Sequence, residues 1–144
     1  NPDDFDATMN LATAHLFAGD YAAAEAQATR ALTLRPGTAD ATRLRGVVAW
    51  RAGRRDDARR WLEEAAAADP RDAKALAWVG TIAHEQRRPA DALAAFRRAL
   101  ARDPLLVEAL VGGTLAALDT GHRADAERWL HQARRLAPGD ARVA

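Results

Sequence analysis

The sequence contains no cysteine and no serine, and these two absences exclude several kinds of chemistry. Without cysteine there is no disulfide, no thiolate metal site and no cysteine nucleophile. Without serine, the Ser-His-Asp route to covalent catalysis is closed as well. What remains is a chain that favours helices and has no obvious catalytic equipment.

Excess charge of one sign and long apolar runs are also missing. The 21 basic residues nearly balance the 20 acidic ones, so charge gives no reason to expect a nucleic-acid partner. No apolar run approaches the roughly 18 residues of a membrane span, and the first residues do not resemble a signal peptide. Arginine outnumbers lysine 20 to 1 and alanine fills 38 positions, which suggests a GC-rich bacterial gene. A cysteine-free chain suits the bacterial cytoplasm and the periplasm equally.

A repeat of 34 residues organises what is present. Five of the six prolines follow this step, namely Pro2, Pro36, Pro70, Pro104 and Pro138. Alanine follows it in three columns, one of which is Ala24, Ala58, Ala92 and Ala126. Since a missed repeat leads to the wrong fold, this period comes before any local pattern. It predicts four repeats over residues 5–38, 39–72, 73–106 and 107–140.

Each repeat is predicted to contain two helices. The first covers about the first fourteen positions and stops near a glycine, which tolerates left-handed geometry past a helix end. This residue is Gly19, Gly53 or Gly121, with Arg87 in the third repeat. The second helix ends before the proline of the repeat, because proline cannot continue a helix.

Short oxygen side chains precede most first helices. Asp4, Thr38, Asp72 and Asp140 stand where such a side chain caps free amide groups, whereas Leu106 cannot do so. Pro89 falls at the start of a second helix, where its missing N–H costs nothing. Bulky residues at the twenty-fourth position, including Phe96 and Leu130, are expected to fill the space beside the alanine columns.

These features resemble the tetratricopeptide repeat family. The resemblance rests on the column of Gly46 and Gly80, on Gly19 and Tyr21 before a second helix, and on the alanine and proline columns. It implies an all-α fold, a right-handed α-solenoid of four 34-residue helix-turn-helix repeats, in which stacking buries faces that one repeat cannot bury. Arg45 and Gly113 replace the leucine that is usual at the seventh position, and they predict distortion of the second and fourth repeats.

The ends of the chain continue the repeat pattern. Residues 1–4 match the tail of a preceding repeat, and residues 141–144 look like the start of a further repeat or a cap. We therefore expect a piece of a longer array, with end repeats that expose apolar surface and are prone to self-association. The alternative is a small complete protein whose ends pair with another copy.

The resemblance also implies a binding surface. In this family, positions 2, 5, 9, 12 and 13 of the first helix line the concave groove where ligands bind. The candidate groove residues carried over onto this sequence are Met9, Thr13, Leu16, Phe17, Arg43, Val47, Trp50, Arg51, Lys74, Thr81, His84, Val111, Leu115 and Leu118. Trp50 is the best anchor candidate, because aromatic side chains and arginines often dominate binding energy.

Catalytic and metal motifs are not found in the sequence. The four histidines lack a recognised ligand spacing, and the stretch that starts at His84 has Arg88 where a zinc-protease helix needs histidine. No metal or cofactor is expected. The arginines around the third repeat form either a solvated face or a docking surface for an acidic partner: Arg87, Arg88, Arg97, Arg98 and Arg102.

Together these patterns predict a non-catalytic protein-interaction scaffold. Its groove is expected to bind a peptide or helix with spaced apolar side chains. One alternative is a structural spacer or self-association module. Another is the partner-recruiting arm of a larger bacterial enzyme or of a secretion or polysaccharide-export protein. Neither a nucleic-acid partner nor direct membrane insertion is expected.

Overall fold

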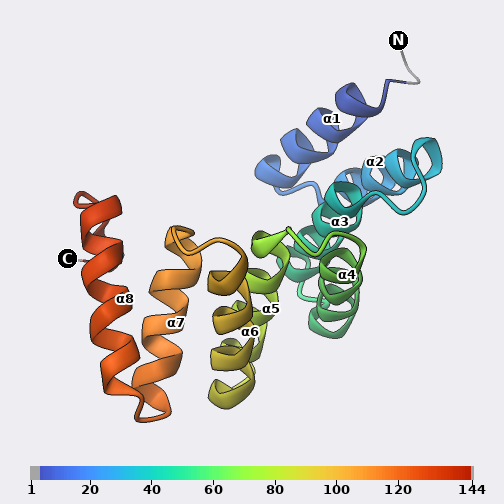
Figure 1. Cartoon of the computed structure of the whole chain (residues 1–144). Helices are drawn as coiled ribbons and strands as arrows, with labels where there is room; N and C mark the ends of the chain where they lie inside the picture. The colour runs from blue at the N-terminus through green and yellow to red at the C-terminus, as the bar shows by residue number, and fades with distance from the viewer. Residues whose placement is uncertain (1–3, 144) are drawn as a thin grey trace. The chain divides into compact units, whose positions relative to one another are not determined.

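The computed structural model describes residues 4–143 and shows an all-helical arrangement (Figure 1). No strand occurs in this part of the chain. The helices are α1 (Phe5–Ala18), α2 (Tyr21–Leu34), α3 (Ala39–Arg51), α4 (Arg55–Ala68), α5 (Ala73–Glu85), α6 (Pro89–Arg102), α7 (Val107–Asp119), α8 (Arg123–Leu136) and the short 3₁₀ helix η1 (Ala141–Val143). They form four pairs joined by tight turns, as the repeat pattern predicts.

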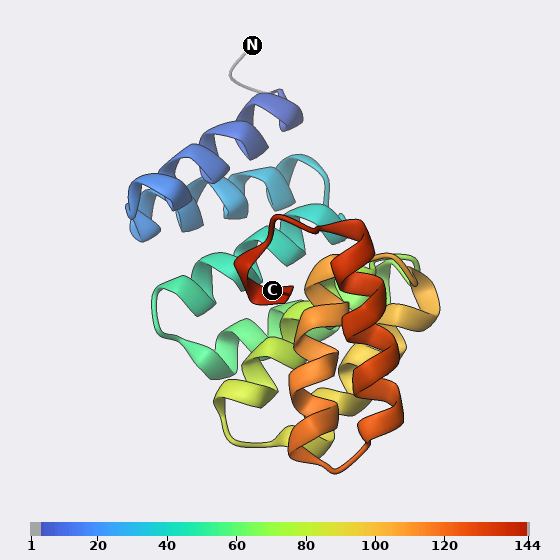
Figure 2. The same ribbon diagram turned by 90° about the vertical axis from the view of Figure 1, so that its left-hand side faces the viewer.

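The helices divide into two compact units. Unit 1 ends at Asp69 and holds α1 to α4, and unit 2 begins at Pro70 and holds α5 to α8 with η1. Within each unit, consecutive helices pack side by side, as Figures 1 and 2 show. First helices also touch one another, since α1 contacts α3 and α5 contacts α7. In each unit a first helix therefore lies beside the first helix of the next pair.

The turn inside each helix pair uses a left-handed residue. Gly19, Gly53 and Gly121 have φ angles of +79°, +82° and +79°, and Arg87 has a φ of +60°. These are the four positions that the repeat pattern singles out, so the prediction is confirmed. Arg87 adopts a geometry that is strained for a residue with a β-carbon.

The predicted caps form at two of the three first helices that follow a candidate residue, and Asp140 accepts a 2.9 Å hydrogen bond from the Arg142 amide in η1. The carboxylate of Asp4 accepts hydrogen bonds from the amides of Asp6 and Ala7, and that of Asp72 accepts one from Ala75. Thr38 was also expected to cap, but its hydroxyl donates to the Arg35 carbonyl at 2.6 Å instead. That prediction is wrong because the hydroxyl finds a nearer partner in the preceding turn. Pro89 begins α6, as expected.

Small residues set how closely the helices approach. All four alanines of the column at positions 24, 58, 92 and 126 are at most 2% exposed. The glycines of the column at positions 46 and 80 also allow close approach of two helices. A β-carbon on Gly46 would lie 2.6 Å from Cγ of Leu62, and one on Gly80 would lie 2.9 Å from the ring of Phe96. Any side chain at these positions would push the two helices of a pair apart.

Phe96 also fills the joint between the two helix pairs of unit 2. Its ring would lie 2.3 Å from a β-carbon on Gly112 of α7. Gly113 faces the ring of Trp129, which would be 3.1 Å from such a carbon. The expected distortion at Gly113 is absent, because α7 runs unbroken from Val107 to Asp119 around this aromatic pair.

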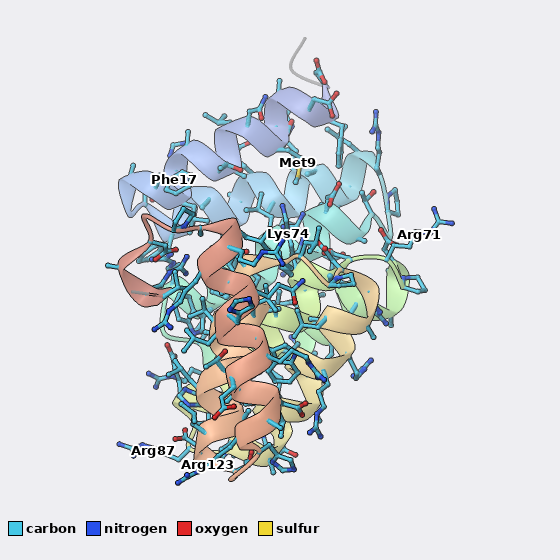
Figure 3. The ribbon with its side chains drawn as sticks, turned by 60° about the vertical axis from the view of Figure 1, so that its left-hand side comes forward. Met9, Phe17, Arg71, Lys74, Arg87 and Arg123 are labelled. Atoms are coloured by element: carbon cyan, nitrogen blue, oxygen red, sulfur yellow. The ribbon has the colours of Figure 1, made fainter. Side chains whose placement is uncertain are left out.

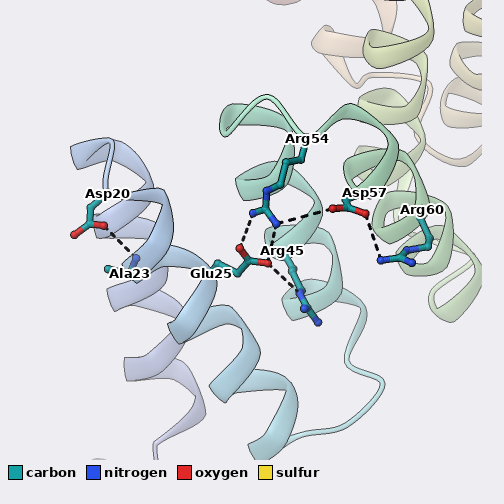
Figure 4. Close-up of polar contacts among 7 residues, drawn as sticks. All are labelled: Asp20, Ala23, Glu25, Arg45, Arg54, Asp57 and Arg60. Atoms are coloured by element: carbon teal, nitrogen blue, oxygen red, sulfur yellow. Dashed lines mark hydrogen bonds and ion pairs between the residues drawn. The ribbon is translucent and has the colours of Figure 1, made fainter.

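Ion pairs cross the corresponding joint in unit 1, beside its buried apolar side chains (Figure 4). Glu25 on α2 accepts hydrogen bonds from Arg54 at 2.5 and 3.2 Å, and the Arg45 side chain on α3 lies 3.8 Å from it. The hydrogen bond from Arg54 lowers the pKa of Glu25, and the positive charges of Arg54 and Arg45 add to this effect. The Arg45 guanidinium also stacks 4.1 Å from the centre of the Trp61 ring. Arg45 therefore fits into a regular α3, and the predicted distortion of the second repeat is wrong.

The structure describes more of the predicted C-terminal extension than of the predicted N-terminal one. Residues 1–3, most of the predicted tail of a preceding repeat, lie outside the described residues. At the other end η1 contacts α8, and Val143 is 1% exposed. Nε of Arg134 donates a 2.7 Å hydrogen bond to the carbonyl of Val143, which attaches this segment to α8.

Candidate functional site

The predicted groove residues occupy the first helices of both units. In unit 1 they come from α1 and α3, and in unit 2 from α5 and α7. Exposure separates them into three groups. Phe17, Arg51, Lys74, Leu115 and Leu118 are exposed, Val47 is buried, and the remaining eight are half-buried.

On α1, the candidates Met9 and Phe17 lie in different environments. Met9 packs against the buried cluster of Phe5, Ala31 and Ala41, so much of its surface belongs to the core of unit 1. Phe17, in contrast, is 84% exposed, the highest value among the large apolar side chains in the described part of the chain. Figure 3 labels both residues on α1. Phe17 therefore offers apolar surface to a partner, and Met9 offers little.

On α3, one candidate is buried and another is partly covered. Val47 was expected to face solvent, but it is only 9% exposed, because α3 packs against α2 and α4 and also touches α1. Trp50 is half-buried, and the Arg51 guanidinium lies 5.1 Å from its ring centre. Arg43 donates a 2.9 Å hydrogen bond to Asp40 on the same helix. The anchor predicted at Trp50 is thus partly covered by its own neighbour.

On α7, three apolar side chains form a stripe along one helix face. Val111, Leu115 and Leu118 are spaced by four and three residues, so they lie one above another. Leu115 is 49% exposed and Leu118 is 54% exposed, whereas Val111 is half-buried. We call these three residues the α7 stripe. It is the most apolar part of the candidate surface in unit 2.

Helix α5 borders this surface with polar side chains. Lys74, labelled in Figure 3, is exposed at the start of α5. The Thr81 hydroxyl donates a 3.0 Å hydrogen bond to the Ala77 carbonyl of its own helix. Nε2 of His84 lies 2.8 Å from the Asp119 carboxylate at the end of α7. This contact joins the ends of α5 and α7 beside the α7 stripe.

The basic residues of the third repeat are partly neutralised. Arg88 lies 2.7 Å from Asp91, and Arg97 lies 2.7 Å from Asp125 on α8. The hydrogen bond from Arg97 lowers the pKa of the Asp125 carboxyl, and the positive charges of Arg128 and Arg97 add to this effect. Sequence reasoning missed this contact between neighbouring pairs. The signal was available in the opposite charges of Arg97 and Asp125, which stand 28 residues apart on successive second helices.

Two features are absent from residues 4–143. These residues contain no group of three or more histidine or carboxylate side chains placed to hold a metal ion. None of their helices combines the length and the hydropathy that crossing a bilayer requires.

Comparison with known families decides the relationship. The profile described as "Tetratricopeptide repeat" matches residues 1–39, 9–72 and 45–106, which is well over half of the sequence. The chain belongs to the tetratricopeptide repeat family. The resemblance drawn from the glycine, alanine and proline columns is thereby confirmed.

Solved tetratricopeptide structures share the fold. A protein from Pseudomonas aeruginosa, PilF, has a TM-score of 0.87 at 25% identity, with 96% of this chain covering 64% of that one. MamA has a TM-score of 0.79 at 18% identity, covering 96% of this chain and 81% of that one. YrrB, described as a tetratricopeptide protein with an unusual peptide-binding site, has a TM-score of 0.74 at 17% identity, covering 99% and 74%.

These likenesses confirm the predicted fold class, an all-α solenoid of helix-turn-helix repeats. Folds of this kind are typical of protein-interaction scaffolds. No curated protein matches the sequence.

Proposed function

We propose that the chain is a non-catalytic scaffold that binds a partner protein through a helix or extended peptide on its first-helix faces. The α7 stripe carries this proposal, because its two leucines are about half exposed on a helix whose other faces are packed. Isolated exposed leucines are common, but an aligned set of three apolar side chains is typical of an interaction surface. The peptide-binding site attributed to the similarly folded YrrB supports the proposal.

The geometry of the stripe indicates the kind of ligand. Val111 and Leu118 are seven residues apart, which corresponds to about 10 Å along a helix. A partner helix with apolar side chains at positions i, i+4 and i+7 presents a matching row. The polar contact of His84 with Asp119 borders this row, so a partner would meet apolar surface beside hydrogen-bonding groups.

A paired set of variants tests this proposal. The variant Leu115→Glu/Leu118→Glu places two charges on the exposed stripe, and Leu136→Glu is the control because Leu136 is 42% exposed on α8, outside the stripe. Val47 is left unchanged, since a charge at that buried position would disturb folding. Circular dichroism first establishes that both variants fold.

The measurement is capture of partners from a bacterial lysate, followed by binding of the purified partner. We expect the wild type and Leu136→Glu to bind the same partner and the stripe variant to lose it. Equal binding by all three proteins would rule out the α7 stripe as the interaction surface.

A second candidate function, self-association, is favoured by the outer face of α1. Ala7 and Ala14 are exposed there, whereas the equivalent residues of α3 and α7 are 0% exposed. Leu11, 46% exposed, and Phe17 add larger apolar surface to α1. Light scattering at increasing concentration distinguishes this function. An oligomer that dissociates in Leu11→Glu/Phe17→Glu and persists in Leu115→Glu/Leu118→Glu would support self-association through α1.

A further inference from the structure

Unit 2 has a hollow on the side of its second helices. Its volume is about 470 Å³, which is within the range of small ligand sites. Its walls come mainly from α6 and α8, and it is not part of the α7 stripe. The lining residues are Arg97, Leu100, Ala101, Pro104, Leu110, Asp125, Arg128, Trp129 and Gln132. We call it the outer hollow.

Two arginines flank a single carboxylate at the rim of the outer hollow. Nη2 of Arg97 donates to one oxygen of Asp125 at 2.7 Å, and Nη2 of Arg128 donates to the other at 2.8 Å. A guanidinium carries five N–H groups, so each arginine keeps donors for a second acceptor. Because two positive charges face one negative charge, the rim has an excess of positive charge that a further carboxylate can balance.

The apolar part of the outer hollow lies next to this rim. Leu100 is 8% exposed and Trp129 is 7% exposed, and the exposed Pro104 completes the lining. A ligand that brings an apolar side chain together with a carboxylate would satisfy both parts of the hollow.

The charge of the surrounding helices points the same way. Helices α6 and α8 together carry seven arginines against three acidic residues, whereas α5 and α7 carry one lysine against three acidic residues. The second helices of unit 2 are therefore basic, and its first helices are slightly acidic. Complementary charge speeds encounter with an acidic partner and favours docking on the second-helix side.

We propose that the outer hollow binds an acidic peptide segment, with a glutamate or aspartate between Arg97 and Arg128 and a neighbouring apolar side chain against Leu100, Pro104 and Trp129. This site is independent of the proposed function of the α7 stripe. A scaffold with both sites would hold two different partners, one on each side of unit 2.

Nuclear magnetic resonance titration of the full chain tests the proposal. The probe is the blocked peptide acetyl-Glu-Leu-Glu-Phe-Glu-amide, and the control peptide has lysine in place of every glutamate. We expect the acidic probe to shift the side-chain Nε–H signals of Arg97 and Arg128 and the indole N–H signal of Trp129. The basic control should leave them unchanged, and Leu115→Glu/Leu118→Glu should bind the acidic probe like the wild type.

Matched variants separate this site from general charge attraction. Arg97→Gln/Arg128→Gln is expected to weaken probe binding about tenfold, while Arg98→Gln/Arg135→Gln removes the same charge from exposed positions on the same helices. In the lining, Gln132→Glu should weaken binding and Gln132→Lys should strengthen it, and neither change removes an ion pair at the rim.

Three results would overturn the proposal. The acidic probe could fail to shift the three signals, or the two double-arginine variants could lose binding equally. A short single-stranded oligothymidylate could also bind the hollow more tightly than the acidic probe, which would assign this surface to nucleic acid instead.

Discussion

The ring of Phe96 occupies the space that a side chain on Gly112 would need, with Cζ 2.3 Å from the position of a β-carbon. The same ring lies 2.9 Å from where a β-carbon of Gly80 would be. Phe96 belongs to α6, Gly80 to α5 and Gly112 to α7, so one side chain fixes the approach of three helices. Because the ring lies against the backbone of both α5 and α7 at these glycines, it cannot easily shift to make room for a side chain.

This arrangement predicts that Gly112→Ala destabilises the protein by about 1–3 kcal/mol, the usual cost of overpacking a core. The better helix propensity of alanine, worth about 1 kcal/mol, offsets part of that cost. Urea unfolding followed by circular dichroism measures the difference. Gly139→Ala is the control, because no atom lies within 4 Å of a β-carbon at that position.

A double variant provides a stricter check of the same contact. Phe96→Leu shortens the side chain, so Phe96→Leu/Gly112→Ala should lose less stability than the two single losses combined. Strict additivity would mean that Phe96 and Gly112 do not interact.

The left-handed turn at Arg87 leads to a stabilising prediction. Arg87 has a φ of +60°, where the corresponding turns have glycine. We expect Arg87→Gly to raise the unfolding free energy by about 0.5–1 kcal/mol, since relief of the left-handed strain outweighs the extra freedom of the unfolded chain. The reverse change, Gly53→Ala, should destabilise. Thermal unfolding of both variants measures the effects, and a lower melting temperature for Arg87→Gly would contradict this reasoning.

The ion pairs at the joint of unit 1 predict a dependence on pH. Arg54 lowers the pKa of Glu25, so the ion pair stabilises the fold above the unfolded pKa of glutamate, near 4.3. That contribution disappears as the pH falls through the lower folded-state pKa. Glu25→Gln should therefore lose up to about 1 kcal/mol at pH 7 and little at pH 3. Urea midpoints at the two pH values test this, and an equal loss at both would show that the charge of Glu25 does not matter.

The helix caps give a matched comparison within the chain. Asp72 accepts a 3.2 Å hydrogen bond from the Ala75 amide, whereas Thr38 makes no such bond at the start of α3. Asp72→Ala should cost about 1 kcal/mol. Thr38→Ala should cost less, because it removes only a bond to the Arg35 carbonyl. Equal costs, measured by urea unfolding, would show that the cap on α5 adds nothing.

The sequence was sufficient for features that depend on position within the repeat. The turn residues, the proline that begins α6 and the paired helices all follow from local backbone preferences that recur every 34 residues. The binding-surface candidates depended on the family resemblance, and their exposure could not be read in this way. Val47 and Leu115 occupy equivalent places in α3 and α7, yet one is buried and the other is 49% exposed.

The failures arise where packing partners lie far apart in the sequence. Leu130 was expected to fill the space beside the alanine columns, but it is only half-buried, and the neighbouring Trp129 is the bulky buried side chain of α8. The reason is that Gly113 leaves room for an indole ring, and this depends on a contact between residues on two helices. Arg45 was read as a source of distortion because its partners, Glu25 and Trp61, are each at least sixteen residues away.

Both units join their two helix pairs with an ion pair as well as with buried apolar side chains. Glu25 pairs with Arg54 in unit 1, and Arg97 pairs with Asp125 in unit 2. These four side chains are partly exposed, whereas the alanines of the column at positions 24, 58, 92 and 126 are buried. The close approach of the helices and the polar contacts between pairs are thus carried by separate residues. Because salt screens exposed charges, ionic strength acts on the contacts between pairs rather than on the packing within them.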